Sequence, residues 1–163
     1  MNAYSEKMMG FLGGRPPIAS LEATHAKLQD VVRRLGKVGL KRTLGPGKWT
    51  AQQIVAHLAD VEIVIGFRLR QALAEDDHTI QPIDQDAWAR RYPPLDTETA
   101  LGSFAALRAW NLGVIRGLAP EEYRRKVNHP ERGEETIEVM VKMLAGHDLN
   151  HLDQLERIAA QAA

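Results

Sequence analysis

Apolar residues recur every three to four positions along four stretches of this chain, and no other feature constrains the fold as strongly. This spacing places apolar side chains on one face of an α-helix, which must then pack against other helices. The predicted helices cover residues 21–36, 50–75, 97–118 and 136–161. Ser20 and Thr50 are candidate caps for the first two helices, and Gln53 completes a capping-box pattern with Thr50. We find no repeat and no convincing pair of strands, so we predict an all-α four-helix bundle.

Two long connections join the predicted helices, at residues 76–96 and 119–135. The first contains three prolines, which predicts an irregular or only briefly helical path. Connections of this length are unusual between bundle helices and often carry function, so we expect both to border the functional site. The candidate residues are Trp88, Arg90, Arg91 and Tyr92 in the first connection and His129 and Arg132 in the second. Their arginines would suit a cofactor carboxylate, although plain surface charge is the commoner role of such residues.

Composition narrows the classes of function. The chain has 163 residues, which suits a single domain, 1–163, with one core. Its 21 Lys and Arg residues balance 21 Asp and Glu residues, and this lack of basic excess argues against nucleic-acid binding. There is no cysteine, so a metal site would have to use His, Asp, Glu or water. We find no signal-peptide pattern and no apolar run long enough to cross a membrane, so we expect a cytoplasmic protein.

Three histidines are predicted to face the bundle core. His147 and His151 lie four residues apart on the last helix, which puts both imidazoles on one face about one turn apart. His57 lies within the apolar stripe of the second helix. Buried imidazoles need partners for their ring nitrogens, and one divalent ion would satisfy three nitrogens at once. The pattern predicts a mononuclear metal site, although a lone histidine on an apolar face is more often a packed core residue.

Two other metal patterns fit the sequence less well. Residues 147–151 imitate the His-Glu-x-x-His motif of zinc proteases, but Asp148 replaces the glutamate. Only 12 residues follow this segment, which is too few for a downstream third ligand with its supporting structure. A di-iron carboxylate bundle would need two inward-facing Glu-x-x-His pairs. That spacing begins at Glu22 and at Glu75, but Glu22 points away from the apolar face and the partner of Glu75 lies beyond its helix.

Three short motifs occur in order along the chain: KWTAQQIVAHLADVE, HPERGEETI and GHDLNHLDQL. With these motifs the chain resembles the DinB/YfiT-like superfamily, and most closely its DinB-like subgroup, over nearly its whole length. The resemblance implies a four-helix bundle with a variant up-and-down topology and one divalent ion. The ligands that it implies are His57, His147 and His151. Gln154 matches a frequent glutamine of the family, whereas Asp148 stands where the family often has glutamate.

The resemblance also implies an activity. Superfamily members of known activity transfer bacillithiol, mycothiol or glutathione, or isomerise maleylpyruvate with a thiol cofactor, and others are classed as hydrolases on structural grounds. For this chain it implies S-transfer of a low-molecular-weight thiol to a small-molecule electrophile, with a metal-dependent hydrolase as the alternative. A homodimer is a further expectation from the family. A non-catalytic stress-response module that binds a metal or ligand, and a plain bundle with structural histidines, remain open interpretations.

The chemistry of the predicted site follows from its ligands. Three neutral imidazoles leave a divalent ion with an open position, where a bound water or thiol becomes more acidic. Zn or Ni suits such a site best, with Cu, Mn or Fe as alternatives. Asp60 and Asp148 are the candidate catalytic carboxylates, for orienting imidazoles or moving a proton, although Asp60 fits a solvated carboxylate equally well. Arg68 falls on the same stripe as His57, and we expect it to pair with a buried acid or to emerge at the far end of the bundle.

Overall fold

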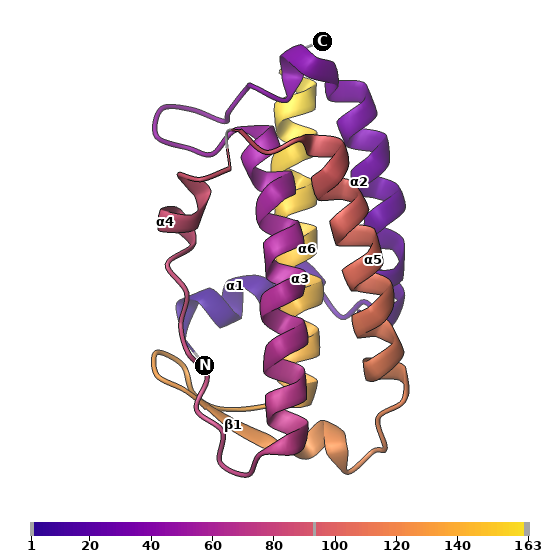
Figure 1. Ribbon diagram of the computed structural model, residues 1–163, viewed down its shortest axis with the longest axis vertical. Helices are drawn as coiled ribbons and strands as arrows, with labels where there is room; N and C mark the ends of the chain where they lie inside the picture. The colour runs from indigo at the N-terminus through magenta and orange to yellow at the C-terminus, as the bar shows by residue number, and fades with distance from the viewer. Residues whose placement is uncertain (1, 93, 162–163) are drawn as a thin grey trace.

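A computed structural model describes residues 2–92 and 94–161 and shows four long helices side by side along the long axis of the molecule (Figure 1). The bundle helices are α2 (Pro17–Gly39), α3 (Ala51–Ala74), α5 (Thr97–Arg116) and α6 (Ile137–Ala160). The shorter helices are α1 (Ala3–Leu12), α4 (Gln85–Ala89) and the 3-10 turn η1 (Glu122–Arg124). The predicted four-helix bundle is confirmed. Within the described residues, no helix combines the length and the apolar character that a membrane span requires.

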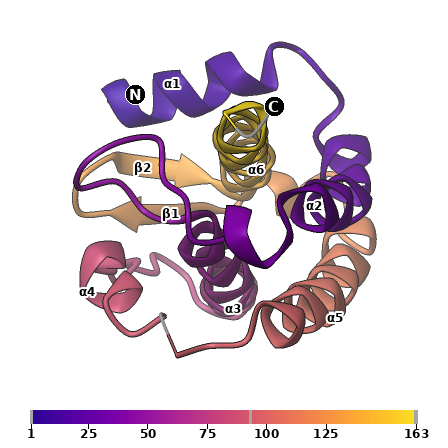
Figure 2. The same ribbon diagram turned by 90° about the horizontal axis from the view of Figure 1, so that it is seen from above.

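The helices that follow one another in sequence are not always neighbours in the bundle. α2 packs against α5 and α6, and α3 packs against the same two helices. The pairs α2/α3 and α5/α6 therefore lie diagonally across the bundle, as Figure 2 shows. This arrangement places α3 directly beside α6, where the predicted histidines lie.

Caps explain most of the helix starts. Thr50 Oγ1 accepts a hydrogen bond from the Gln53 N–H (3.2 Å), and Gln53 Oε1 accepts one from the Thr50 N–H (2.9 Å), so the predicted capping box is confirmed. The prediction that Ser20 caps the first bundle helix is wrong. α2 already begins at Pro17, whose missing N–H costs nothing in the first turn, and the Ser20 hydroxyl donates to the Pro16 carbonyl (3.0 Å).

The second long connection contains a β-hairpin, so the prediction of no strand pair is wrong. β1 (Lys126–His129) and β2 (Gly133–Thr136) are antiparallel, and His129 lies opposite Gly133. The buried positions of the hairpin are Val127, His129 and Glu135, and two of the three are polar. The usual alternation of apolar and polar residues is therefore missing from the sequence. The Ile80 N–H donates to the Asn128 carbonyl (2.8 Å), which fastens the hairpin to the first long connection.

Helix α1 was not expected either, and it lies across the outer side of α6 (Figure 2). Asn2 caps its start, Gly13 ends it in the left-handed conformation (φ 57°), and Met8 and Leu12 are buried beneath it. The two helices approach very closely at Gly146 of α6. A Cβ atom at that position would lie 2.0 Å from the Met8 carbonyl oxygen, so only glycine fits this crossing.

We expect Gly146→Ala to loosen α1 from α6 and to lower the free energy of unfolding by about 1–3 kcal/mol, because backbone atoms cannot yield as a flexible side chain would. Urea unfolding measures the stability, and limited proteolysis near Gly13 measures the release of α1. Gly10→Ala is the matched control, since its Cβ would meet no atom within 4 Å. That variant is expected to be neutral or slightly stabilising. Equal free energies of unfolding and equal proteolysis of the two variants would contradict the prediction.

Candidate metal centre

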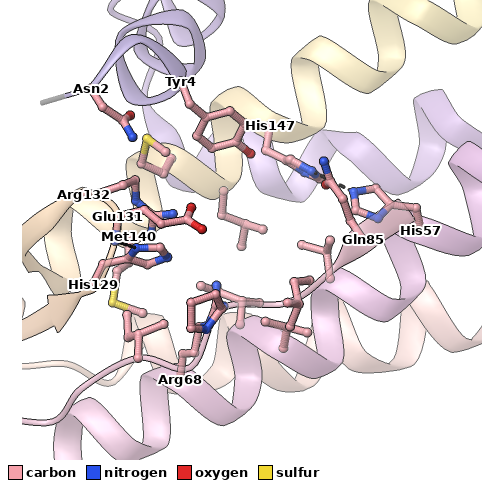
Figure 3. Close-up of a pocket in the computed structure, with 18 residues that line it drawn as sticks. Asn2, Tyr4, His57, Arg68, Gln85, His129, Glu131, Arg132, Met140 and His147 are labelled. Atoms are coloured by element: carbon pink, nitrogen blue, oxygen red, sulfur yellow. Dashed lines mark hydrogen bonds between the residues drawn. The ribbon is translucent and has the colours of Figure 1, made fainter. Parts of the chain in front are cut away.

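Three imidazoles meet between α3 and α6. His57 comes from α3, and His147 and His151 come from successive turns of α6. His147 Nε2 lies 3.1 Å from His57 Nε2 and 3.1 Å from His151 Nε2. One nitrogen from each ring lies within 4.8 Å of the other two, and all three residues are buried. Figure 3 shows His57 and His147 directed toward one another. The structure therefore brings together the three histidines expected from the sequence.

Neighbouring polar groups set the orientation of the α6 imidazoles. Gln154 Oε1 lies 2.9 Å from His151 Nδ1. Because that oxygen only accepts hydrogen bonds, His151 Nδ1 carries the proton and Nε2 keeps its lone pair. Asp148 Oδ1 lies 3.9 Å from His147 Nδ1, which favours a proton on that nitrogen in the same way. Both rings thus present an Nε2 lone pair to the centre of the cluster.

The cluster suits a bound cation better than it suits three free imidazoles. Burial lowers the pKa of His57 to about 3, with a further contribution from His147, and burial holds the pKa of His151 well below its ordinary value. Both rings are therefore neutral at pH 7. His147 Nε2 has either one lone pair or one proton, so without a metal it can form a hydrogen bond with only one of the two neighbouring nitrogens, His57 Nε2 or His151 Nε2. Ligands about 2.1 Å from a tetrahedral ion lie roughly 3.4 Å apart, which is close to the 3.1 Å between His147 Nε2 and the Nε2 atoms of His57 and His151.

A buried charge network adjoins the cluster and links α3, α5 and α6. Arg108 Nη2 donates to Glu62 Oε1 (2.7 Å), and Arg108 Nη1 lies 2.7 Å from Asp148 Oδ2. Asn111 Nδ2 donates to Glu62 Oε2 (3.1 Å). Burial alone would raise the pKa of Asp148, but Arg108 and His147 hold it below its usual value. Asp148 is therefore a charged residue held between Arg108 and the His147 ring.

The sequence predicts only part of this charge network. Glu62 interrupts the apolar sequence of its helix. Arg108 lies on the apolar stripe formed by Phe104, Leu112 and Ile115. The inward position of Arg108 therefore follows from helical spacing. Its two carboxylate partners do not, because they come from other helices.

A pocket of about 350 Å³ opens beside the histidines. His57 and His147 line one end, and Arg68, His129 and Arg132 line the other, as Figure 3 shows. The N-terminal end of α1 closes one side. The apolar residues along the pocket include Val61, Val64, Ile65, Met140, Met143 and Leu144. The second long connection thus borders the site through His129 and Arg132, as expected.

The first connection borders this pocket with other residues than those expected. Trp88, Arg90, Arg91 and Tyr92 line a separate hollow, together with Asp60. The residues of this connection that do line the histidine pocket are Ile80, Pro82, Ile83 and Gln85. Asp60 is offset from His57 by about 60° around α3, and this offset turns its carboxylate toward the separate hollow. The structure does not bring Asp60 to the histidine pocket.

The structure does not place Arg68 beside a buried acid, which was one of the two positions expected for it. Arg68 forms no ion pair with a carboxylate of residues 2–92 or 94–161. Its Nη2 donates to the Gln81 carbonyl (2.8 Å), and its side chain lines the pocket. The stripe of α3 that carries His57 continues along the pocket wall, which explains this position.

Residues 20–155 match the family model described as the DinB superfamily. The chain belongs to the DinB superfamily. This DinB protein is 31% identical over 136 residues to an Oceanobacillus iheyensis protein named "Putative metal-dependent hydrolase", over 83% of this chain and 79% of that protein. It is 29% identical over 149 residues to Bacillus subtilis YfiT, which bears the same description, over 87% of this chain and 82% of YfiT.

The fold of this DinB protein is also that of YfiT. A solved structure of YfiT superimposes with a TM-score of 0.84 at 25% identity, covering 90% of this chain and 85% of that chain. It is described as a "probable metal-dependent hydrolase with an unusual four-helix bundle topology". The family expected from the three motifs is confirmed. The matched region contains the three clustered histidines but not α1, which closes the pocket.

Proposed function

We propose that this DinB protein is a metal-dependent enzyme that transfers a low-molecular-weight thiol to a small electrophile. In this proposal His57, His147 and His151 hold one divalent ion. The main support for this proposal is that the histidine cluster opens onto the pocket. His57 and His147 line the pocket, whereas His151 does not. A small molecule in the pocket would reach two of the three imidazoles directly.

The chemistry of the donor set supports this proposal. A divalent ion held by three neutral imidazoles keeps an open position and lowers the pKa of the water or thiol that occupies it. Zn²⁺ and Ni²⁺ suit these ligands best, and Mn²⁺ and Fe²⁺ are the alternatives. The chain has no cysteine, so the sulfur nucleophile must come from a small molecule.

The protein's own side chains orient the ligands and shield the reacting groups. Gln154 fixes the His151 ring through Nδ1, and Asp148 faces Nδ1 of His147. The Trp49 ring covers the cluster, 4.8 Å from the His57 ring and stacked parallel to the His151 ring at 6.3 Å. Trp49 therefore shields one side of the imidazoles, and the apolar pocket walls would surround a bound thiol on another side.

Metal-dependent hydrolysis is the second candidate, and the names of the relatives favour it. The same site would then act on water instead of a thiol. Both candidates need the three histidines and the pocket, so they differ only in the nucleophile.

The test is an assay of the Zn²⁺- or Ni²⁺-loaded protein with monochlorobimane and each of glutathione, bacillithiol and mycothiol. In the reaction the thiol sulfur bonds to carbon, chloride leaves, and the thiol proton passes to solvent. We expect one thiol to react at least about a hundredfold faster than without protein. His57→Gln should abolish this acceleration, whereas His25→Gln, outside the cluster, should retain it.

Hydrolysis of 4-nitrophenyl acetate by the same preparations measures the second candidate. Metal-dependent hydrolysis without thiol transfer would replace the first proposal with the second. Neither reaction, in a protein that does bind the metal, would favour a non-catalytic metal-binding module.

A further inference from the structure

At the end of the pocket away from the histidines lies Arg68, which has no carboxylate partner within residues 2–92 and 94–161. Arg68 is partly buried, and its Nη2 donates a hydrogen bond to the Gln81 carbonyl. Burial lowers the pKa of Arg68, and Arg132 lowers it further, against the opposing effect of Glu135. An arginine nevertheless keeps its proton in proteins. The pocket therefore contains a positive charge that has lost part of its water.

A buried histidine presents a hydrogen-bond donor to the same space. His129 is only 4% exposed, and its Nδ1 accepts the Glu131 backbone N–H (3.2 Å). The proton of the neutral ring must then lie on Nε2. Burial lowers the pKa of His129, and Arg132 adds to this effect, so the ring is neutral. Among residues 2–92 and 94–161 no hydrogen-bond partner of Nε2 is found, and the side chain lines the pocket near Arg68 (Figure 3).

The other charged residues at this end are either paired or exposed. Arg132 is held by Glu135 through two hydrogen bonds, of which the Nη2 to Oε2 distance is 2.8 Å. Glu131 also lines the pocket, but it is exposed, so water solvates its carboxylate. Arg68 is therefore the partly buried charge at this end that has no ion-pair partner among residues 2–92 and 94–161. A monoanion matches this charge, whereas a dianionic phosphate would face repulsion from Glu131 and Glu135.

The remaining walls fix the shape of a ligand. Apolar side chains separate Arg68 and His129 from the histidine cluster. His57 and Arg68 lie about 16 Å apart along α3 at 1.5 Å per residue, and the arginine leans back toward the helix start. A ligand that touches both ends therefore spans on the order of 10 Å, with an apolar middle.

We infer that Arg68 and His129 form a carboxylate subsite, so that a reactant of this enzyme carries a carboxylate joined through a short apolar segment to its reacting atom. This inference rests on the proposed function, because it assumes that the histidine end is the reacting end. The guanidinium of Arg68 and the Nε2–H of His129 would bind the two carboxylate oxygens.

Calorimetric titration of the 163-residue chain with hexanoate and with its neutral analogue hexanamide tests the inference. Hexanoate has the charged head and the apolar tail that the pocket requires. We expect it to bind at least about tenfold more tightly than hexanamide, since a hydrogen bond to a charged group contributes more than one to a neutral group.

Three variants assign the preference to the subsite. Arg68→Gln keeps a donor for the Gln81 carbonyl but loses the charge, and it should weaken hexanoate binding at least about tenfold without affecting hexanamide. His129→Asn keeps an acceptor for the Glu131 N–H but loses the donor, and it should weaken hexanoate binding about fivefold. Arg33→Gln removes the same charge from an exposed position on α2, and hexanoate should bind it as it binds the wild type.

The inference would be overturned by any of three results. These are no hexanoate binding up to about 10 mM, equal binding of hexanamide, or unchanged binding in Arg68→Gln. Tighter, Arg68-dependent binding of inorganic phosphate would overturn the carboxylate assignment. The same titration with His57→Gln separates the two proposals, because the carboxylate should still bind without the metal. Loss of hexanoate binding in that variant would mean that the carboxylate binds the metal end and would overturn the subsite.

Discussion

The protein purified without a polyhistidine tag or chelator is expected to contain about one divalent metal ion per chain, and both His57→Ala and His151→Ala should lose it. Each substitution removes one of three converging nitrogens. The loss in metal affinity should exceed the roughly 10–100-fold loss that follows removal of a residue that only orients a ligand. Elemental analysis of the wild type and the two variants after dialysis measures the result.

Two further variants make this measurement specific. His25→Ala, a histidine of α2 whose ring stacks near Phe104 at 6.4 Å, should keep the full metal content. Gln154→Ala should keep the site but weaken it by about 10–100-fold, because the His151 ring loses its Nδ1 partner. A wild-type protein that takes up neither Zn²⁺ nor Ni²⁺ on reconstitution would contradict the metal centre. The three histidines would then be packed core residues whose replacement changes stability alone.

Replacing Arg108 with methionine is expected to lower the free energy of unfolding by about 3–5 kcal/mol. Arg108 is 3% exposed and lies 2.7 Å from a carboxylate oxygen of both Glu62 and Asp148. Without it, two carboxylates are left buried with no cation beside them, and the interior solvates such charges poorly. Urea unfolding, with the midpoint and slope measured together, gives the change in stability.

A neutralised network is the control for Arg108→Met. The triple variant Glu62→Gln, Arg108→Met and Asp148→Asn leaves no charge in this network, so it should recover most of the stability that the single variant loses. Arg33→Met removes an arginine from an exposed pair with Asp30 and should cost at most about 1 kcal/mol. If Arg108→Met lowered the free energy of unfolding no more than Arg33→Met does, the buried network would not be a charged one.

The parts of the fold that depend on near neighbours in the sequence are predicted well. The Thr50 capping box joins residues three apart, and the apolar stripes of the bundle helices extend over many turns. The missed elements lack such signals. α1 is only 10 residues long, and the hairpin buries His129 and Glu135 instead of apolar residues. The end of α2 is also longer than predicted, because the chain continues to Gly39 beyond a non-helical Gly36.

The two ends of the pocket also differ in how well the sequence predicts them. Helical spacing and the family motifs predict the cluster of His57, His147 and His151, since two of these share one face of one helix. The other end depends on where the hairpin packs. His129 reaches Arg68 only because β1 pairs with the connection that follows α3, and no local pattern encodes that contact.

By itself, the sequence determined the four long helices, their apolar faces and the inward direction of the three clustered histidines, because helical geometry relates residues a few positions apart. The tertiary structure alone decided that α3 lies beside α6, that Arg108 joins Glu62 to Asp148, and that α1 and the hairpin border the pocket that Arg68 lines. These features are contacts between distant residues. They follow from how whole helices pack and satisfy buried charge together, which no short stretch of sequence specifies.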